Sequence, residues 1–284
     1  MKHRFSVRIG PIGFRVGADW RAPIDRLRDL YRDYPTPDVA DFTVRLSAAR
    51  PWRRWIRPSV TIGGDYMLPE AAPLPLAQGL LAAEMAMNLQ LALGGRRYLL
   101  LHASAVERDG CALLMTGESG AGKSTLATLL AAAGWRFMGD EFALVDPGTG
   151  LVHAFPRLVS LKNGSIAAAR AASPGARFGP LLAATPKGDI RHMVPDARAI
   201  AAMDEPAIPA LLLFPRFGLA TATRTVPQSE AFVRLTQAST NYVALGEAGF
   251  TALTRLVRTV PSIAIDYPDG AAAVAQVDAL WRDR

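Results

Sequence analysis

The sequence predicts an α/β protein with a central mixed sheet flanked by helices, preceded by a small N-terminal α+β segment. From residue 98 onward, short apolar runs typical of buried strands alternate with helix-forming segments. A glycine-rich motif stands between one such strand and one such helix. The chain has 284 residues, 50% of them hydrophobic, which is enough for one large domain or two modest ones around a substantial core.

The first 75 residues carry the pattern of a small α+β unit. Strands are predicted at 5–9, 13–16, 41–46 and 58–64, with a hairpin turn at Gly10 and Pro11 joining the first two, and a helix at 24–34. The Pro-rich stretch 67–76 resembles a linker. We therefore predict a first domain over residues 1–75 and a second over residues 76–284.

The second domain is predicted to open with a helix over 76–93, whose polar residues suit packing inside a protein. After it, strands are predicted at 98–106, 111–116, 137–146, 210–214 and 262–267. Helices are predicted at 124–134, 230–237, 248–260 and 271–281. Residues 156–195 form a mixed region with a predicted loop, for which the pattern predicts no definite helix or strand.

Composition narrows the function classes. No segment is apolar enough to span a membrane, and the N-terminus lacks the apolar core of a signal peptide, so we expect a cytoplasmic protein without a membrane partner. The single cysteine, Cys111, excludes internal disulfides and multi-cysteine metal sites. The net charge of +7 fits nucleic acid, an acidic partner or an arginine-rich surface.

The run RPWRRWIRP, residues 50–58, interleaves arginine with tryptophan as a nucleic-acid patch would. The residues of this run alternate with a period of two, and this pattern favours instead an edge strand whose arginines face solvent. We therefore expect that nucleic acid is not the partner. Salt-dependent binding of random DNA or RNA would support the other interpretation.

Residues 117–125 read GESGAGKST and fill the pattern G-x-x-x-x-G-K-[ST]. In such a loop, glycines let backbone N–H groups turn toward phosphate oxygens, and the following helix adds the positive end of its dipole. A strand pattern precedes the loop and a helix pattern follows it, as this interpretation requires. The predicted phosphate-binding residues are Gly117, Glu118, Ser119, Gly120, Ala121, Gly122, Lys123, Ser124 and Thr125.

Two adjacent acids, Asp140 and Glu141, follow the next apolar run. One of them can hold Mg²⁺ together with Ser124, and the other, or the same one, can take a proton from an acceptor. The competing interpretation is a solvated turn. His102 ends the apolar run before the loop strand, where a histidine is either packed or catalytic.

The chain has only four lysines, and arginine supplies the other side-chain cations. The lysines are Lys2, Lys123, Lys162 and Lys187. A retained lysine indicates a site that needs a compact point charge. Lys123 lies in the phosphate loop. Lys162 and Lys187, each close to a glycine, are candidates for binding phosphate or an anionic acceptor, with Arg191 and His192 as possible additions; surface loops are the alternative.

Residues 102–146 resemble the catalytic core of the HPr kinase/phosphorylase family, with a histidine, a short hairpin, the phosphate loop, a helix and a pair of acids. The loop followed by GDE also resembles the phosphoenolpyruvate carboxykinase fold, to which that kinase domain is related. Segments such as RIGPIGFRV, PRLVSLKNGSI, TPKGDIRHMVP and NYVALGEAGF resemble the subgroup called HprK-related kinase A. The resemblance covers nearly the whole chain.

The resemblance implies nucleotide binding by residues 117–125, metal binding and proton transfer by Asp140 and Glu141, and a position for His102 near the transferred phosphate. The family has aspartate where this chain has Glu141. The glycine-rich signature that follows the acids and is associated with phosphorolysis is not found in this sequence. The resemblance therefore extends neither to the reverse reaction nor to HPr as the partner.

Together these observations predict an ATP-dependent kinase that uses Mg²⁺ and phosphorylates a hydroxyl, by resemblance a serine of a protein or peptide. A small-molecule acceptor such as a sugar is an alternative, and so is a nucleotide-binding regulatory protein with little turnover. The presence of Asp140, Glu141 and His102 together argues against the regulatory alternative. The sequence is also compatible with a homo-oligomer. It contains no motif that decides between ATP and GTP.

Overall fold

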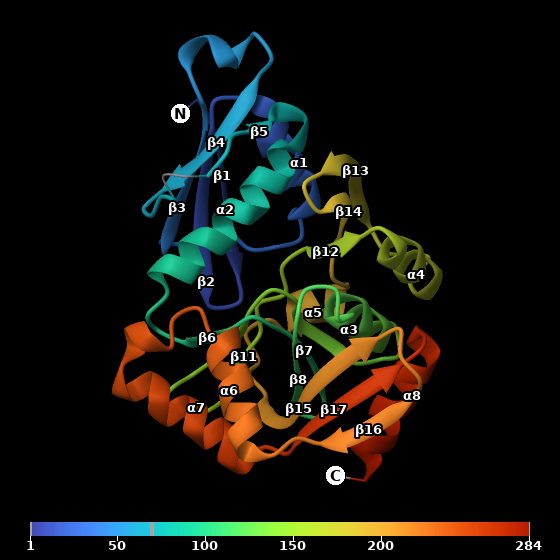
Figure 1. Cartoon of the computed structure of the whole chain (residues 1–284). Helices are drawn as coiled ribbons and strands as arrows, with labels where there is room; N and C mark the ends of the chain where they lie inside the picture. The colour runs from blue at the N-terminus through green and yellow to red at the C-terminus, as the bar shows by residue number, and fades with distance from the viewer. Residues whose placement is uncertain (1, 69–70, 284) are drawn as a thin grey trace.

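The computed structural model describes residues 2–68 and 71–283; Pro69 and Glu70 of the predicted linker and both terminal residues lie outside this description. Two lobes stand one above the other (Figure 1). The upper, N-terminal lobe is a five-stranded sheet in the order β1-β2-β3-β4-β5 with two helices. Its elements are β1 (His3–Ile9), β2 (Ile12–Ala18), α1 (Arg21–Leu30), β3 (Phe42–Ala48), the 3₁₀ turn η1 (Pro51–Arg54), β4 (Ser59–Gly64), β5 (Leu74–Pro75), the 3₁₀ turn η2 (Leu76–Gln78) and α2 (Gly79–Gly94).

Both helices pack on this sheet. In α1, Ile24, Leu27 and Leu30 recur at helical spacing and are buried. In α2, Leu80 and Met87 belong to the same core cluster as strand residues such as Val44. Residues 79–94 therefore share a core with the N-terminal sheet, while the division after residue 75 remains a prediction.

The lower, C-terminal lobe contains a six-stranded sheet in the order β16-β17-β15-β8-β7-β9. Strands β8, β15 and β17 are parallel to one another, and the other three pair antiparallel. The predicted α/β class with a central mixed sheet is thus confirmed. The strands are β7 (Ala103–Arg108), β8 (Cys111–Thr116), β9 (Arg136–Gly139), β15 (Ile208–Phe217), β16 (Ala222–Thr225) and β17 (Ser262–Tyr267).

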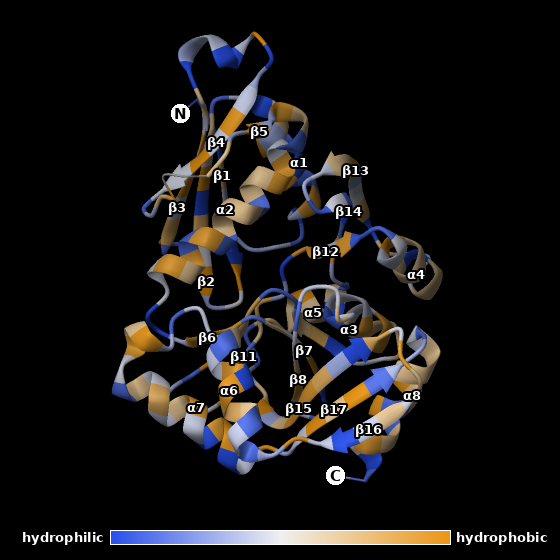
Figure 2. Ribbon diagram, in the orientation of Figure 1, coloured by the Kyte–Doolittle hydropathy of each residue, from blue (hydrophilic) through white to orange (hydrophobic). Residues whose placement is uncertain are grey.

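Helices cover both faces of this sheet. Alternate residues of β8 point to opposite sides, so Leu113 packs with α3 (Lys123–Ala132) and α8 (Gly270–Arg282). Leu114 packs on the other side, with α6 (Gln228–Ala238) and α7 (Glu247–Thr259); the 3₁₀ turn η3 (Val243–Leu245) joins these two helices. Between these layers, β15 and β17 are largely hydrophobic (Figure 2), whereas the edge strand β16 is exposed. Within the described residues, no helix has the length and hydropathy needed to cross a membrane.

Two small sheets join the lobes. The first is β11 (Val152–His153), β10 (Ala143–Val145) and β6 (Leu99–Leu101); the second is β12 (Val159–Lys162), β14 (Gly188–Met193) and β13 (Phe178–Thr185). Two short helices, α4 (Gly164–Ala172) and α5 (Ala197–Ala201), follow β12 and β14. The mixed region of the sequence analysis thus contains a β-hairpin that its irregular pattern did not predict.

Two predicted strands are each divided. The run 98–106 breaks at His102 into β6 and β7, and the run 137–146 breaks at residues 140–142 into β9 and β10. In each case the two pieces join different sheets. Apolar residues flank each break on both sides, which is why the sequence predicted one strand.

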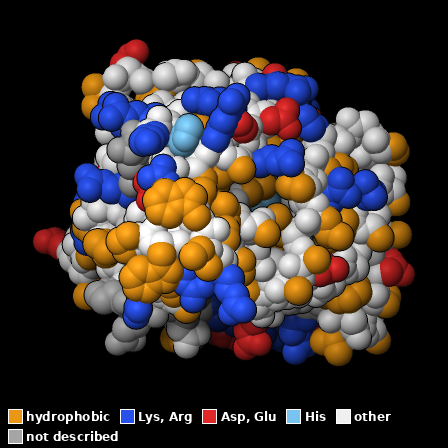
Figure 3. Space-filling model, turned by 90° about the horizontal axis from the view of Figure 1, so that it is seen from above, with side chains coloured by type: hydrophobic (Ala, Val, Ile, Leu, Met, Phe, Trp, Pro, Cys, Tyr) orange, Lys and Arg blue, Asp and Glu red, His pale blue; other side chains and the backbone are white. Residues whose placement is uncertain are grey.

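The run at residues 50–58 is not the expected edge strand. It contains the 3₁₀ turn η1 and connects β3 to β4. Trp52 and Trp55 are 50% and 74% exposed there. Figure 3, which looks down on the N-terminal lobe, shows hydrophobic and basic side chains next to each other on this face.

Candidate functional site

The topology brings the predicted site residues to one edge of the six-stranded sheet. Parallel strands β8, β15 and β17 end at the same edge, where α/β proteins commonly bind ligands. Because β7 is antiparallel to β8, its first residue, Ala103, lies opposite Thr116. His102 therefore precedes β7 at this edge, and the end of β9 delivers Asp140 to it, since Gly139 pairs with Ala105.

The glycine-rich loop connects β8 to α3. Gly120 and Gly122 have φ angles of 88° and 94°, which non-glycine residues rarely adopt. At Gly122 a Cβ atom would also lie 2.3 Å from the hydroxyl oxygen of Tyr267, so glycine is required there twice over. Lys123 is buried and donates hydrogen bonds to the carbonyl oxygens of Gly117 (2.8 Å) and Glu118 (3.0 Å). Burial lowers the pKa of Lys123, and the positive charge of Lys162 acts in the same direction.

Asp140 is buried, and no cation of the described residues is in hydrogen-bond contact with it. The Ser104 hydroxyl donates to Asp140 Oδ1 at 2.7 Å, and the Ser124 hydroxyl lies close enough to lower the pKa of this carboxylate. Burial, followed by the negative charge of Glu141, raises the pKa of Asp140 to about 6. A buried carboxylate in this state is typical of functional sites.

His102 and Glu141 form a more accessible pair beside Asp140. The imidazole Nδ1 lies 3.1 Å from the carbonyl oxygen of Glu141 and 3.7 Å from its Oε2. Because a carbonyl oxygen only accepts, Nδ1 carries the hydrogen, which leaves Nε2 as the proton acceptor of the neutral ring. Burial lowers the pKa of His102; Lys123 and Lys162 contribute, while Glu141 opposes the shift.

The four predicted anion-binding residues occupy different surroundings. Lys162, at the end of β12, lies close enough to lower the pKa of both His102 and Lys123. Lys187 is exposed in the turn between β13 and β14. Arg191 donates to the carbonyl oxygen of Gly179 at 2.8 Å. His192 is buried near Glu84 and Arg157, and burial lowers its pKa. Of the four, the electrostatics link Lys162 most directly to the loop.

Two residues at this edge were not singled out from the sequence. Ser104 is a fully buried hydroxyl in the apolar strand β7, two residues after His102. Tyr267 ends β17, and its hydroxyl donates to the carbonyl oxygen of Ala121 at 3.2 Å. Burial raises the pKa of Tyr267 to about 12. A polar residue within the apolar run of residues 103–106 was the available signal for Ser104.

The oxygen groups at this edge fit Mg²⁺. Across the described residues, no cluster of three or more His, Cys, Asp or Glu side chains is arranged to hold a metal. Mg²⁺ in phosphate-binding sites needs fewer protein ligands, because phosphate oxygens and water complete its shell. The Ser124 hydroxyl and the nearby Asp140 carboxylate supply the hard oxygen donors that this ion prefers.

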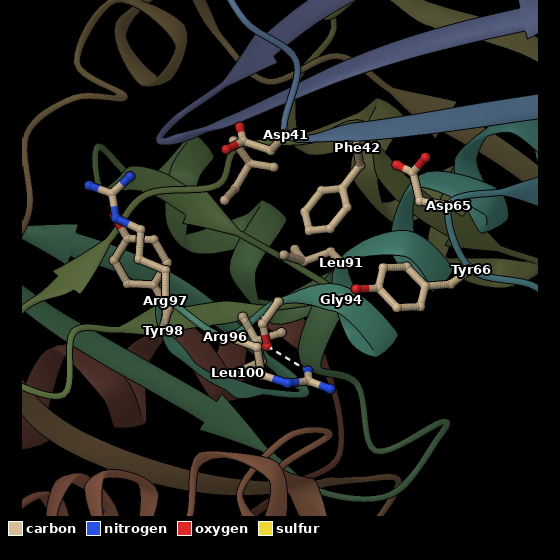
Figure 4. A pocket seen from close by; sticks show the side chains of 12 residues that line it. Asp41, Phe42, Asp65, Tyr66, Leu91, Gly94, Arg96, Arg97, Tyr98 and Leu100 are labelled. Carbon is tan, nitrogen blue, oxygen red and sulfur yellow. Dashed lines mark hydrogen bonds between the residues drawn. The ribbon is translucent and has the colours of Figure 1, made fainter.

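A separate cavity of about 380 Å³ lies between the N-terminal sheet, the end of α2 and β6. Asp41, Asp65, Tyr66, Arg96 and Arg97 are among the side chains around it (Figure 4). The predicted site residues are not among its lining residues. We therefore place the candidate chemistry at the glycine-rich loop, where the titratable groups gather.

Comparison with known proteins gives matches among solved structures alone. No profile of a known protein family matches the chain. No curated protein matches it either. Among solved structures, the Hpr(Ser) kinase/phosphatase from Coxiella burnetii matches 65% of this chain and 88% of its own chain, with 16% sequence identity and a TM-score of 0.33. A similarity at this level does not establish a family, so the chemistry has to be argued from this chain's own residues.

Proposed function

We propose that this protein is an ATP-dependent phosphotransferase that moves the γ-phosphate of ATP to a hydroxyl group. The observation that carries the proposal is the meeting of the glycine-rich loop, the buried Asp140 and the neutral imidazole of His102 at one sheet edge. The loop amides and the N-terminus of α3 bind the phosphates. Lys123 exchanges its two carbonyl partners for phosphate oxygens.

Ser124 and Asp140 would hold Mg²⁺, which would supply positive charge to the phosphate groups. In the protein alone, burial and then the negative charge of Glu141 raise the pKa of Asp140, so this carboxylate is suited to a site that receives a cation.

His102 accepts the proton of the acceptor hydroxyl at Nε2. The hydroxyl oxygen forms a bond to the γ-phosphorus while the bond from that phosphorus to the β,γ-bridging oxygen breaks, and ADP leaves. The lowered pKa keeps the imidazole neutral near pH 7, ready to accept a proton. The Glu141 carboxylate near Nδ1 stabilises the imidazolium that forms, and Lys123 and Lys162 compensate the phosphate charge.

For the acceptor we propose a serine hydroxyl of a protein or peptide, on the resemblance of residues 102–146 to HPr kinases. A small-molecule hydroxyl, such as that of a sugar, is the alternative. Incubation with labelled ATP, Mg²⁺ and cell lysate, followed by mass spectrometry of the labelled products, separates the two. ATP binding without any labelled product or ADP release would favour a regulatory nucleotide-binding protein instead.

The roles are tested with His102→Ala and Asp140→Asn. We expect His102→Ala to bind ATP normally in calorimetry and to lose about 10²–10⁴-fold in transfer rate. Asp140→Asn should retain ATP binding and lose transfer. The control is Asp109→Asn, which changes an exposed aspartate in the turn at the opposite end of β7 and β8 and should transfer normally. If either site variant transfers as fast as the wild type, the proposed roles are wrong.

A further inference from the structure

The sheet order fixes the direction in which a bound nucleotide must run. His102 and Asp140 lie on the side of β8 that carries β7 and β9. The γ-phosphate faces these residues in the proposed reaction. The other end of the nucleotide therefore leaves across the N-terminus of α3, toward β15 and β17 on the opposite side of β8.

An aromatic ring stands at that opposite side, beside the loop. Phe217 is the last residue of β15 and is 58% exposed. A Cβ atom placed on Gly122 would lie 3.3 Å from the Cβ of Phe217, so the Phe217 side chain starts directly next to the helix N-terminus. Exposure of a single phenylalanine is ordinary. Its position next to the loop, away from the catalytic residues, is the informative feature.

The ring is carried on a well-defined turn. The Phe217 and Tyr267 rings lie 5.9 Å apart between centroids. The backbone N–H of Gly218 donates to the carbonyl oxygen of Tyr267 at 2.8 Å, and Tyr267 in turn donates to the loop at Ala121. Phe217 is thus fixed relative to the phosphate loop through Tyr267, as a binding residue has to be.

We propose that Phe217 forms the stacking face for the purine base of the nucleotide held by the glycine-rich loop. This inference rests on the proposed function. Base–aromatic stacking tolerates any base, because every base has a π-face. The neighbouring Arg216 and Asp266 are paired with each other at 2.7 Å through both oxygens of the carboxylate. The site therefore binds ATP and GTP with similar affinity.

The test compares the affinity for nucleotides with the affinity for tripolyphosphate, which has the phosphates but no base. Calorimetry with Mg²⁺ measures the affinity of Phe217→Ala for ATP, GTP and inorganic tripolyphosphate. We expect about a tenfold weaker affinity for both nucleotides and no change for tripolyphosphate. Phe217→Trp should bind ATP like the wild type, whereas Phe217→Leu, which keeps apolar packing without the aromatic face, should behave like Phe217→Ala. Leu219→Ala, in the same exposed segment, is the control and should bind all three normally.

Unchanged nucleotide affinity in Phe217→Ala would overturn the inference. An equal loss for tripolyphosphate would also overturn it, because the ring would then be supporting the loop. Lys123→Ala separates this failure from failure of the proposed function. If Lys123→Ala weakens all three ligands while Phe217→Ala weakens none, only the stacking site is wrong. If Lys123→Ala changes none of the three affinities, the phosphate-loop assignment itself is wrong.

Discussion

The buried carboxylates of Glu84 in the N-terminal lobe and Asp140 in the candidate site have opposite electrostatic surroundings. A positive charge lies next to the first, and a negative charge lies near the second. The two residues are 5% and 6% exposed. Glu84 pairs with the guanidinium of Arg157 and accepts from the Tyr31 hydroxyl at 3.0 Å. Asp140 has two serine hydroxyls and a second negative charge nearby. The guanidinium of Arg157 therefore compensates the charge of Glu84, whereas the charge of Asp140 is not compensated until a cation or a proton binds.

The comparison distinguishes a structural from a functional buried acid. Arg157 also donates to Asn88 and to the backbone of Glu84, so this cluster ties α2 to the segment after β11. Although burial acts to lower the pKa of Arg157, Glu84 and Tyr31 raise it above its ordinary value, and the charge is retained. The charge of an acid paired in this way is compensated within the fold, whereas an unpaired acid is available for ligand chemistry.

The largest effect is expected when the paired acid is neutralised. Glu84→Gln leaves the Arg157 guanidinium buried without its counter-charge, which should lower the free energy of unfolding by about 3–5 kcal/mol. Denaturant titration at pH 7 measures the loss. The double variant Glu84→Gln/Arg157→Met removes both charges and should recover most of it. If Glu84→Gln lowers the free energy of unfolding by less than about 1 kcal/mol, Glu84 does not compensate the Arg157 charge, and the proposed difference between Glu84 and Asp140 is wrong.

Neutralising Asp140 should raise the free energy of unfolding, whereas neutralising Glu84 should lower it. The pKa of Asp140 is about 6 in the folded protein and 3.8 ordinarily, so ionisation of Asp140 above pH 6 opposes folding. Asp140→Asn should therefore raise the free energy of unfolding of the ligand-free protein at pH 8, by up to about 3 kcal/mol. The gain should shrink to about half at pH 5, because the carboxyl then holds a proton in the folded state.

Denaturant titrations at pH 8 and pH 5 test this expectation, with Asp109→Asn as a control that should change stability at neither pH. A loss of stability in Asp140→Asn, or a gain independent of pH, would contradict the environment described for Asp140.

The smallest effect concerns two lysines that the sequence treats alike. Lys162→Met should slow phosphate transfer by about tenfold. It should also raise the pKa of His102, because a positive charge that lowers this pKa is removed. The acid limb of the pH profile of kcat/KM would then move to higher pH. Lys187→Met, in the exposed hairpin turn, should leave both the rate and the profile unchanged. Equal effects of the two variants would place Lys187 at the site as well.

The strand, glycine-rich loop and helix at residues 111–132 could be predicted from sequence because their determinants are local. Buried-strand composition before Gly117, glycines at fixed offsets and helix formers after Lys123 all act within about twenty residues. The mixed central sheet followed in the same way from the alternation of strands and helices. The hairpin of β13 and β14 was missed because its pattern does not match a single period. The turn at residues 50–58 was wrongly predicted as a strand because its residues alternate with the period of a strand.

The sequence by itself thus determined the loop, its flanking strand and helix, and the adjacency of Asp140 and Glu141. The tertiary structure alone decided that the strands break at His102 and Asp140, that Lys162 acts on His102, and that Arg157 pairs with Glu84 across 73 positions of the chain. Hydrogen bonding along a strand and helix periodicity are set by near neighbours. The pKa of a buried group depends on whichever distant residues packing brings within a few ångströms, and no local pattern encodes them.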